Sequence, residues 1–148
     1  MLKDNMKEIK NKIWDLYGLL RGEINSDDYS VILLLIYLQS KNILVKTLND
    51  ENPKESLIKT LECKNDSKLS KVYEVFLPII KSIDSKLIRH LLEKLTSIDP
   101  DFLQNNINEI FDNTLDRIVL SQGRKYGEFI QPKQISKFIS SFIGSTKD

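Results

Sequence analysis

Apolar residues recur in steps of three and four along most of the chain, the spacing that gathers them on one face of an α-helix. The first such stripe runs from Leu2 to Leu20 and stops before Gly22, a residue type that readily ends a helix in the left-handed conformation. Similar stripes follow as far as Ile143, separated by short segments rich in Asn, Asp, Ser or Pro. No segment makes a convincing strand. The pattern therefore predicts an all-α fold, an irregular bundle of about six or seven helices.

One segment, Val31–Leu38, is apolar on every side and so must be surrounded by other elements. Its β-branched residues would also suit a buried strand. A helix is favoured because about 20 residues separate the Ser26-Asp27 start from the loop at Leu48–Pro53, which is helix length. We expect a central helix from about Asp27 to Lys46. The apolar run is far shorter than the ~20 residues needed to cross a bilayer, so no membrane span is expected.

Helix starts and breaks are marked in the second half of the chain. Asp84 is a predicted N-cap, and Asp99-Pro100 combines a cap with a proline in the first turn. From there the pattern predicts one long helix to Val119. Pro78 interrupts an otherwise helical stripe, and we expect it to kink or split the helix, as a local bend or as a hinge.

Composition and charge narrow the class of protein. A chain of 148 residues can bury a real core as one domain. The single Cys63 forms no internal disulfide, and the N-terminus lacks a signal-peptide pattern, so a cytoplasmic location is expected. With 22 basic and 21 acidic residues, the total charge indicates no nucleic-acid partner. From Arg117 onward, however, six basic and two acidic residues give a net charge of +4.

No familiar catalytic or metal-binding cluster is present in the sequence. His90 is the only histidine and lies among leucines, which is typical of a helix surface or boundary position. Cys63 and His90 are too few for a zinc site, and no glycine-rich phosphate loop occurs. Glu109, Asp112 and Asp116 share a helical face that could bind a divalent cation, although a solvated acidic face explains them as well. We predict no catalytic residue and no metal ligand.

Two segments carry recognisable motifs. Gly127–Pro132 reads Gly-Glu-Phe-Ile-Gln-Pro, and upstream Trp14–Gly22 is followed by Asp28-Tyr29 and the apolar run. These two segments resemble motifs of N-6 adenine DNA methyltransferases, especially the modification subunits of type I restriction systems. They follow one another along the chain in the same order as in that family. The first is similar to the Gly-Glu/Gln-Phe-x-Thr-Pro motif that opens the catalytic domain, and the second to the Leu-Arg-Gly and Leu-rich pattern of the helical N-terminal domain.

The resemblance implies that residues 1–122 form the helical N-terminal domain of such a subunit and that residues 123–148 are a loop and short helix leading into a catalytic domain absent from this chain. The parent enzyme would use S-adenosylmethionine, whereas this chain alone would be inactive and bind no cofactor. Phe129, Gln131 and Pro132 would border the cofactor pocket. Arg124 and Lys125 would contact DNA phosphates. The implied partners are DNA and the specificity and restriction subunits.

A second hypothesis needs no missing enzyme. The chain could be a free-standing helical adaptor that binds another protein through the stripe around Trp14 and Tyr17. The absence of any complete active site in the sequence motivates this alternative.

Overall fold

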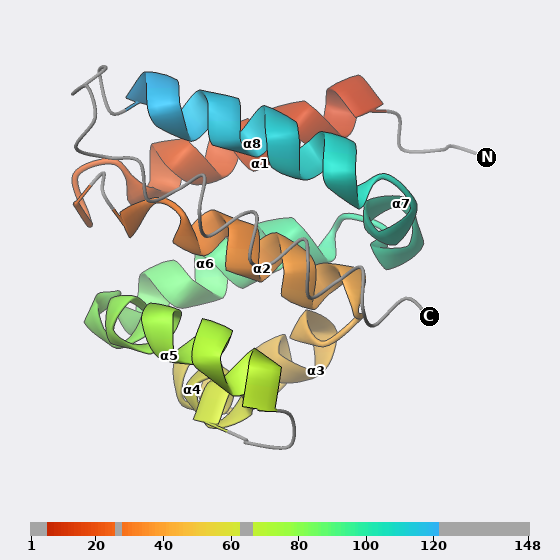
Figure 1. Ribbon diagram of the computed structural model, residues 1–148. Coiled ribbons are helices and arrows are strands. Elements are labelled where there is room, and N and C mark those ends of the chain that lie inside the picture. Colours follow the sequence, from red (N-terminus) through yellow and green to blue (C-terminus); the bar gives the residue numbers. More distant parts are fainter. Residues whose placement is uncertain (1–5, 26–27, 63–66, 122–148) are drawn as a thin grey trace.

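The computed structural model describes residues 6–25, 28–62 and 67–121, and within these ranges the chain is entirely helical apart from its turns (Figure 1). The only β-type pairing among the described residues is an isolated bridge between Arg21 and Ile24. The predicted all-α class is confirmed. The helices are α1 (Met6–Leu20), α2 (Val31–Ser40), α3 (Leu44–Leu48), α4 (Pro53–Glu62), α5 (Ser67–Ser82), α6 (Ser85–Thr96), α7 (Pro100–Asn105) and α8 (Ile107–Ser121).

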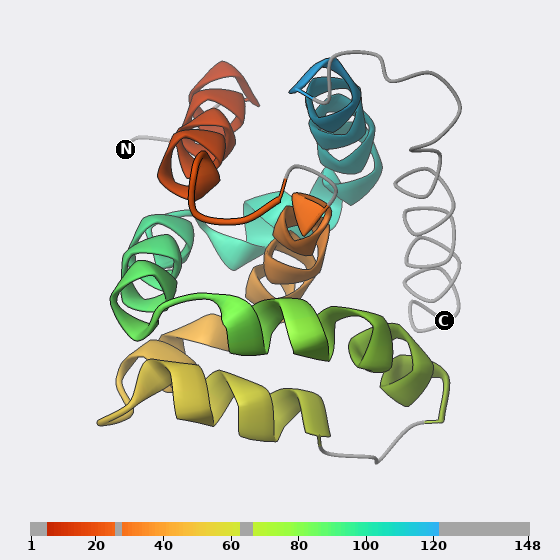
Figure 2. The same cartoon turned by 90° about the vertical axis from the view of Figure 1, so that its left-hand side faces the viewer.

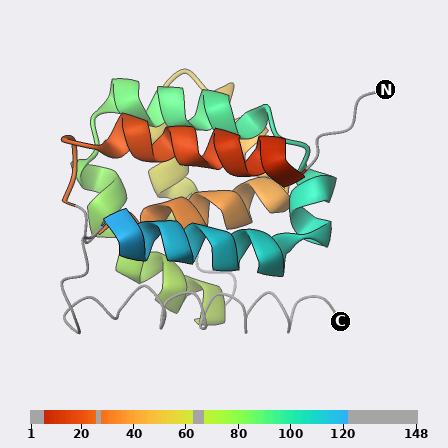
Figure 3. The same ribbon diagram turned by 90° about the horizontal axis from the view of Figure 1, so that it is seen from above.

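Helix α2 forms the centre of the bundle. Every residue from Val31 to Ser40 is buried, and the helix packs against α3, α5, α6, α7 and α8. Figures 2 and 3 show α1 and α8 on two sides of α2, with α4 and α5 forming a layer beneath it. The sequence correctly predicted a central helix here, because a segment that is apolar all round has no face suited to solvent.

The predicted span of this helix was wrong at both ends. Instead of one helix from Asp27 to Lys46, the chain turns after Ser40 and starts α3 at Leu44. Asn42 makes this turn in the left-handed conformation, with φ of 59°, which asparagine tolerates better than most residues. The amide of Asn42 donates to the carbonyl of Gln39 over 2.8 Å, closing the turn.

A buried amide fixes the centre of the bundle to the connection between α6 and α7. The Nε2 atom of Gln39 donates to the carbonyl oxygen of Ile98 over 2.8 Å. The Oε1 atom of the same side chain is buried without a hydrogen-bond partner. Gln39 therefore positions the connection specifically, at the cost of one unsatisfied acceptor.

Two predicted N-caps are confirmed. The carboxylate of Asp84 accepts a hydrogen bond from the amide of Lys86 over 3.0 Å, and that of Asp99 accepts from the amide of Asp101 over 3.1 Å. The long helix expected from Asp99 to Val119 is divided, because Asn106 leaves the helical conformation and separates α7 from α8. Its side-chain Nδ2 donates to the carbonyl of Phe102 over 2.9 Å, which closes the end of α7.

Pro78 does not split its helix. A single helix, α5, runs from Ser67 to Ser82 through the proline. A proline removes one backbone hydrogen bond and leaves a carbonyl one turn earlier without its helical donor. Pro78 is exposed, so water can reach this part of the helix.

The upper layer of the bundle pairs α1 with α8. The two helices run side by side in the same direction above α2 (Figures 1 and 3). Lys10 of α1 forms an ion pair with Glu109 of α8, 3.4 Å between Nζ and Oε2. No described helix is both long enough and apolar enough to span a bilayer.

Candidate functional site

Several predicted site residues lie outside the described part of the chain. These are the expected DNA contacts Arg124 and Lys125 and the expected cofactor contacts Phe129, Gln131 and Pro132. The predicted segment 123–148, with its loop and short helix, also falls there. The structure tests none of these predictions.

The acidic face of α8 makes no cluster in the described residues. No group of three or more His, Cys, Asp or Glu side chains in the described ranges is arranged to hold a metal ion. Glu109 instead pairs with Lys10 across to α1, while Asp112 and Asp116 are exposed. These carboxylates thus occupy a solvated helix face, which was the alternative interpretation of the pattern.

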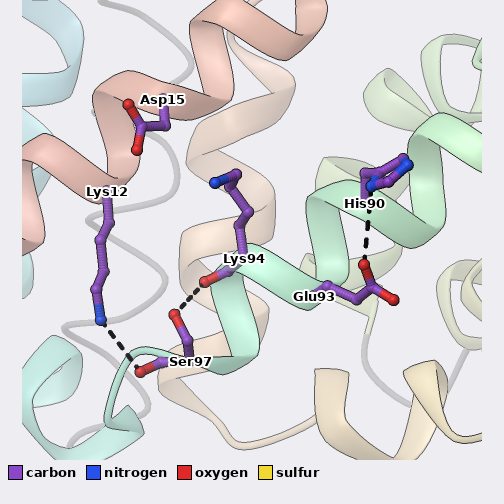
Figure 4. A pocket seen from close by; sticks show the side chains of 6 residues that line it. All are labelled: Lys12, Asp15, His90, Glu93, Lys94 and Ser97. Atoms are coloured by element: carbon purple, nitrogen blue, oxygen red, sulfur yellow. Dashed lines mark hydrogen bonds and ion pairs between the residues drawn. The ribbon is translucent and has the colours of Figure 1, made fainter.

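His90 lines an open pocket of about 520 Å³ between α1 and α6 (Figure 4). It is on the helix surface, as predicted, and its side chain is 64% exposed. The other lining residues are Lys12, Asp15, Glu93, Lys94 and Ser97.

Most of the polar groups in this pocket are already engaged with each other. His90 Nδ1 lies 3.7 Å from Glu93 Oε1, Lys12 Nζ donates to the carbonyl of Ser97 over 3.5 Å, and Ser97 Oγ donates to the carbonyl of Lys94 over 2.7 Å. Figure 4 shows these side chains along the rim rather than converging on one point. The pocket is a mixed-charge depression in which no nucleophile faces a base.

A different kind of site lies on the other side of α1. Trp14, the only tryptophan of the chain, has 37% of its surface exposed, although tryptophan is usually well buried. The guanidinium carbon of Arg117 on α8 lies 4.5 Å from the centre of the indole ring, which is a cation–π contact. The ring of Tyr17 lies 4.9 Å away and is tilted by 48°. The indole is therefore positioned on two sides while part of it stays in contact with solvent.

The adaptor hypothesis placed the contact around Trp14 and Tyr17, and of these two residues Tyr17 is buried against α8. It is only 2% exposed, and its hydroxyl donates to the carbonyl of Thr114 on α8 over 2.9 Å. Burial raises the pKa of the Tyr17 hydroxyl, an effect that Arg117 partly offsets. This position, three residues after Trp14, lies at the boundary facing α8. The buried ring of Tyr17 packs against Trp14.

Gly18 completes this surface, and the sequence analysis missed it. It lies one turn after Trp14 on α1 and is exposed, and a Cβ added there would meet no atom within 4 Å. A glycine inside a helix costs about 1 kcal/mol relative to alanine, and no neighbour within the described bundle requires it. The signal available in the sequence was a glycine four residues after the tryptophan, within one predicted helix. We call Trp14, Gly18 and Arg117 the Trp14 surface.

Comparison with known proteins identifies the family. A family model described as viral polyprotein N-terminal matches residues 1–147. No curated protein and no solved structure matches the chain. The family match contradicts the resemblance to type I methyltransferase subunits, and with it the expected function and the expected parent enzyme. The short motifs were misleading because such residue patterns also occur by chance in unrelated proteins.

The expected cofactor and partners came only through that resemblance. S-adenosylmethionine, DNA and the specificity and restriction subunits stay untested predictions. The match over residues 1–147 includes nearly every position of the chain, the described helices among them. The chain belongs to the viral polyprotein N-terminal family.

Proposed function

We propose that this domain is a protein-binding module whose contact surface is the Trp14 surface on α1 and α8. The single observation that carries the proposal is an indole that is 37% exposed yet held in place by Arg117 and Tyr17. Its location on the paired helices α1 and α8, away from the α1–α6 pocket, separates this surface from the mixed-charge depression. A cytoplasmic location is part of the proposal and is based on the single cysteine of the sequence.

The chemistry of these side chains suits protein binding. Tryptophan and arginine are enriched among the residues that dominate protein interfaces. A tryptophan fixed in one orientation loses little conformational entropy when a partner covers it. Covering the remaining third of an indole of roughly 240 Å² buries about 90 Å², which corresponds to about 2 kcal/mol. Loss of Trp14 should therefore weaken binding by about 30-fold.

Site-specific photo-crosslinking in the cells where the protein is naturally produced would test this proposal. A photoreactive residue replaces Asn11, which is exposed on α1 about one turn before Trp14, in one variant and Val75 in a control variant, since Val75 is also exposed but lies on α5. We expect a discrete adduct, identified by mass spectrometry, from position 11 alone. The adduct should disappear when Trp14→Ala is added. The same adducts from both positions, or adducts unaffected by Trp14→Ala, would contradict the proposal.

A further inference from the structure

We infer that the partner bound by the Trp14 surface is a second copy of this chain, in a twofold dimer that packs α1 antiparallel against α1. This inference builds on the proposed function, because it names the occupant of the same surface. The dimer places Trp14 of each copy over Gly18 of the other.

The shape of α1 supports the twofold arrangement. Trp14 projects from the helix, and Gly18, four residues later, leaves open space around its Cα on the same exposed side. A twofold interface uses the same patch on both copies, so a projection and a gap on one patch can fit each other twice. Antiparallel packing centred between residues 14 and 18 meets this condition. Glycine at the gap allows the second helix to approach closely.

One pair of opposite charges at the two ends of α1 is compatible with the antiparallel direction. Lys7 is exposed in the first turn of the helix, and Glu23 is exposed just after its last turn. When α1 packs antiparallel on its copy about a point between residues 14 and 18, Lys7 of each chain comes near Glu23 of the other. Such exposed pairs add little affinity, and Glu8 and Arg21 are exposed at the same ends, so the direction is based mainly on the fit of Trp14 to Gly18.

The available area indicates a weak dimer. A helix of 15 residues, the length of α1 and of α8, is about 22 Å long. Two adjacent helices present a face about 20 Å wide, or about 450 Å² per copy. The total of about 900 Å² is below the range of stable specific interfaces and within that of weak or transient ones. Association should therefore be visible only at high protein concentration.

Sedimentation velocity of the purified chain, from about 1 μM to about 1 mM, tests the inference. We expect the mass to rise from 17.2 kDa towards twice that value as the concentration increases. Trp14→Ala removes the projection and Gly18→Gln fills the gap. Because each contact occurs twice in the dimer, each change should weaken association by at least about 30-fold. Circular dichroism would verify that both variants keep the helical fold.

Two further variants separate an interface from a purely structural role. Val75→Ala removes an exposed apolar side chain from α5 and should dimerise like the wild type. Gly18→Ala should raise the melting temperature of the monomer, since a Cβ has room there, without strengthening the dimer. A wild type that is monomeric at 1 mM, or Trp14→Ala associating as strongly as the wild type, would overturn the inference.

The dimer and the proposed function can fail separately. If position 11 crosslinks to a different protein and sedimentation finds only monomer, the dimer is refuted while the docking role of the Trp14 surface is supported. If neither crosslinks nor dimers depend on Trp14, both are refuted.

Discussion

Replacing Tyr17 with phenylalanine removes one hydroxyl from the contact between α1 and α8 and leaves the ring in place. That hydroxyl is buried and donates to the carbonyl of Thr114 over 2.9 Å. A buried neutral hydrogen bond contributes about 1 kcal/mol to net stability. Tyr17→Phe should therefore lower the free energy of unfolding by about 1 kcal/mol at pH 7, which for a domain of this size is about 2–4 °C in melting temperature.

The same substitution should reverse its effect at alkaline pH. Burial raises the pKa of Tyr17 in the folded protein, whereas the unfolded chain ionises near the ordinary value of about 10. Above that pH the unfolded state binds fewer protons than the folded state, so the contribution of Tyr17 to stability falls as the pH rises. The loss reaches about 1 kcal/mol at about pH 11. Phenylalanine does not ionise, so the two stability curves should cross between about pH 10 and pH 11.

Urea unfolding of both proteins at intervals between pH 7 and pH 11, followed by circular dichroism, measures this directly. All other ionisable groups are the same in both proteins, so their effects cancel in the difference. Equal slopes of urea dependence would verify that the substitution acts on stability alone. A difference between the two proteins that stays constant from pH 8 to pH 11 would show that the Tyr17 hydroxyl is not buried as described.

Three other substitutions test the local structure by the same urea assay. Gly22→Ala should lower the free energy of unfolding by about 1 kcal/mol, because Gly22 follows α1 at a φ of +83°. Gly18→Ala should raise the free energy of unfolding by about 0.5–1 kcal/mol, because a Cβ has room at that position. Equal effects of the two substitutions would refute this distinction. Asp84→Ala removes the N-cap of α6 and should cost about 1 kcal/mol, while Asp84→Asn, which keeps an acceptor, should cost less. Leu34→Ala in the buried α2 should cost about 2–5 kcal/mol, and a loss below 1 kcal/mol would show that the core closes around the gap.

Helix existence could be predicted from this sequence because burial acts on the periodicity of side chains. The central position of α2 followed from its uniformly apolar surface, and the starts of α6 and α7 followed from Asp84 and Asp99, whose side chains can satisfy free amides locally. The breaks at Asn42 and Asn106 were missed, since an asparagine within an apolar stripe is also compatible with a continuing helix. At those points the tertiary packing of α3 and α8 decides the path of the chain.

The candidate site was only partly accessible to the same reasoning. A tryptophan at a helix position between buried and exposed faces can point either way, and the sequence identified Trp14 without determining its exposure. It could not show that Arg117, more than 100 residues away, covers one face of the indole. The sequence also could not show that Tyr17 is buried, because no local signal shows where α8 lies. Contacts between distant segments determine these details.

The complete enclosure of α2 has a consequence for how the bundle opens. Its ten residues, Val31 to Ser40, have at most 8% of their surface exposed, so fraying of any one outer helix uncovers little of it. Amide protons in this helix can exchange with deuterated solvent only when most of the surrounding helices separate at once. Their exchange rate therefore measures the opening of the whole domain. A ligand that binds an outer helix should slow this exchange only by as much as it raises the free energy of unfolding of the entire domain.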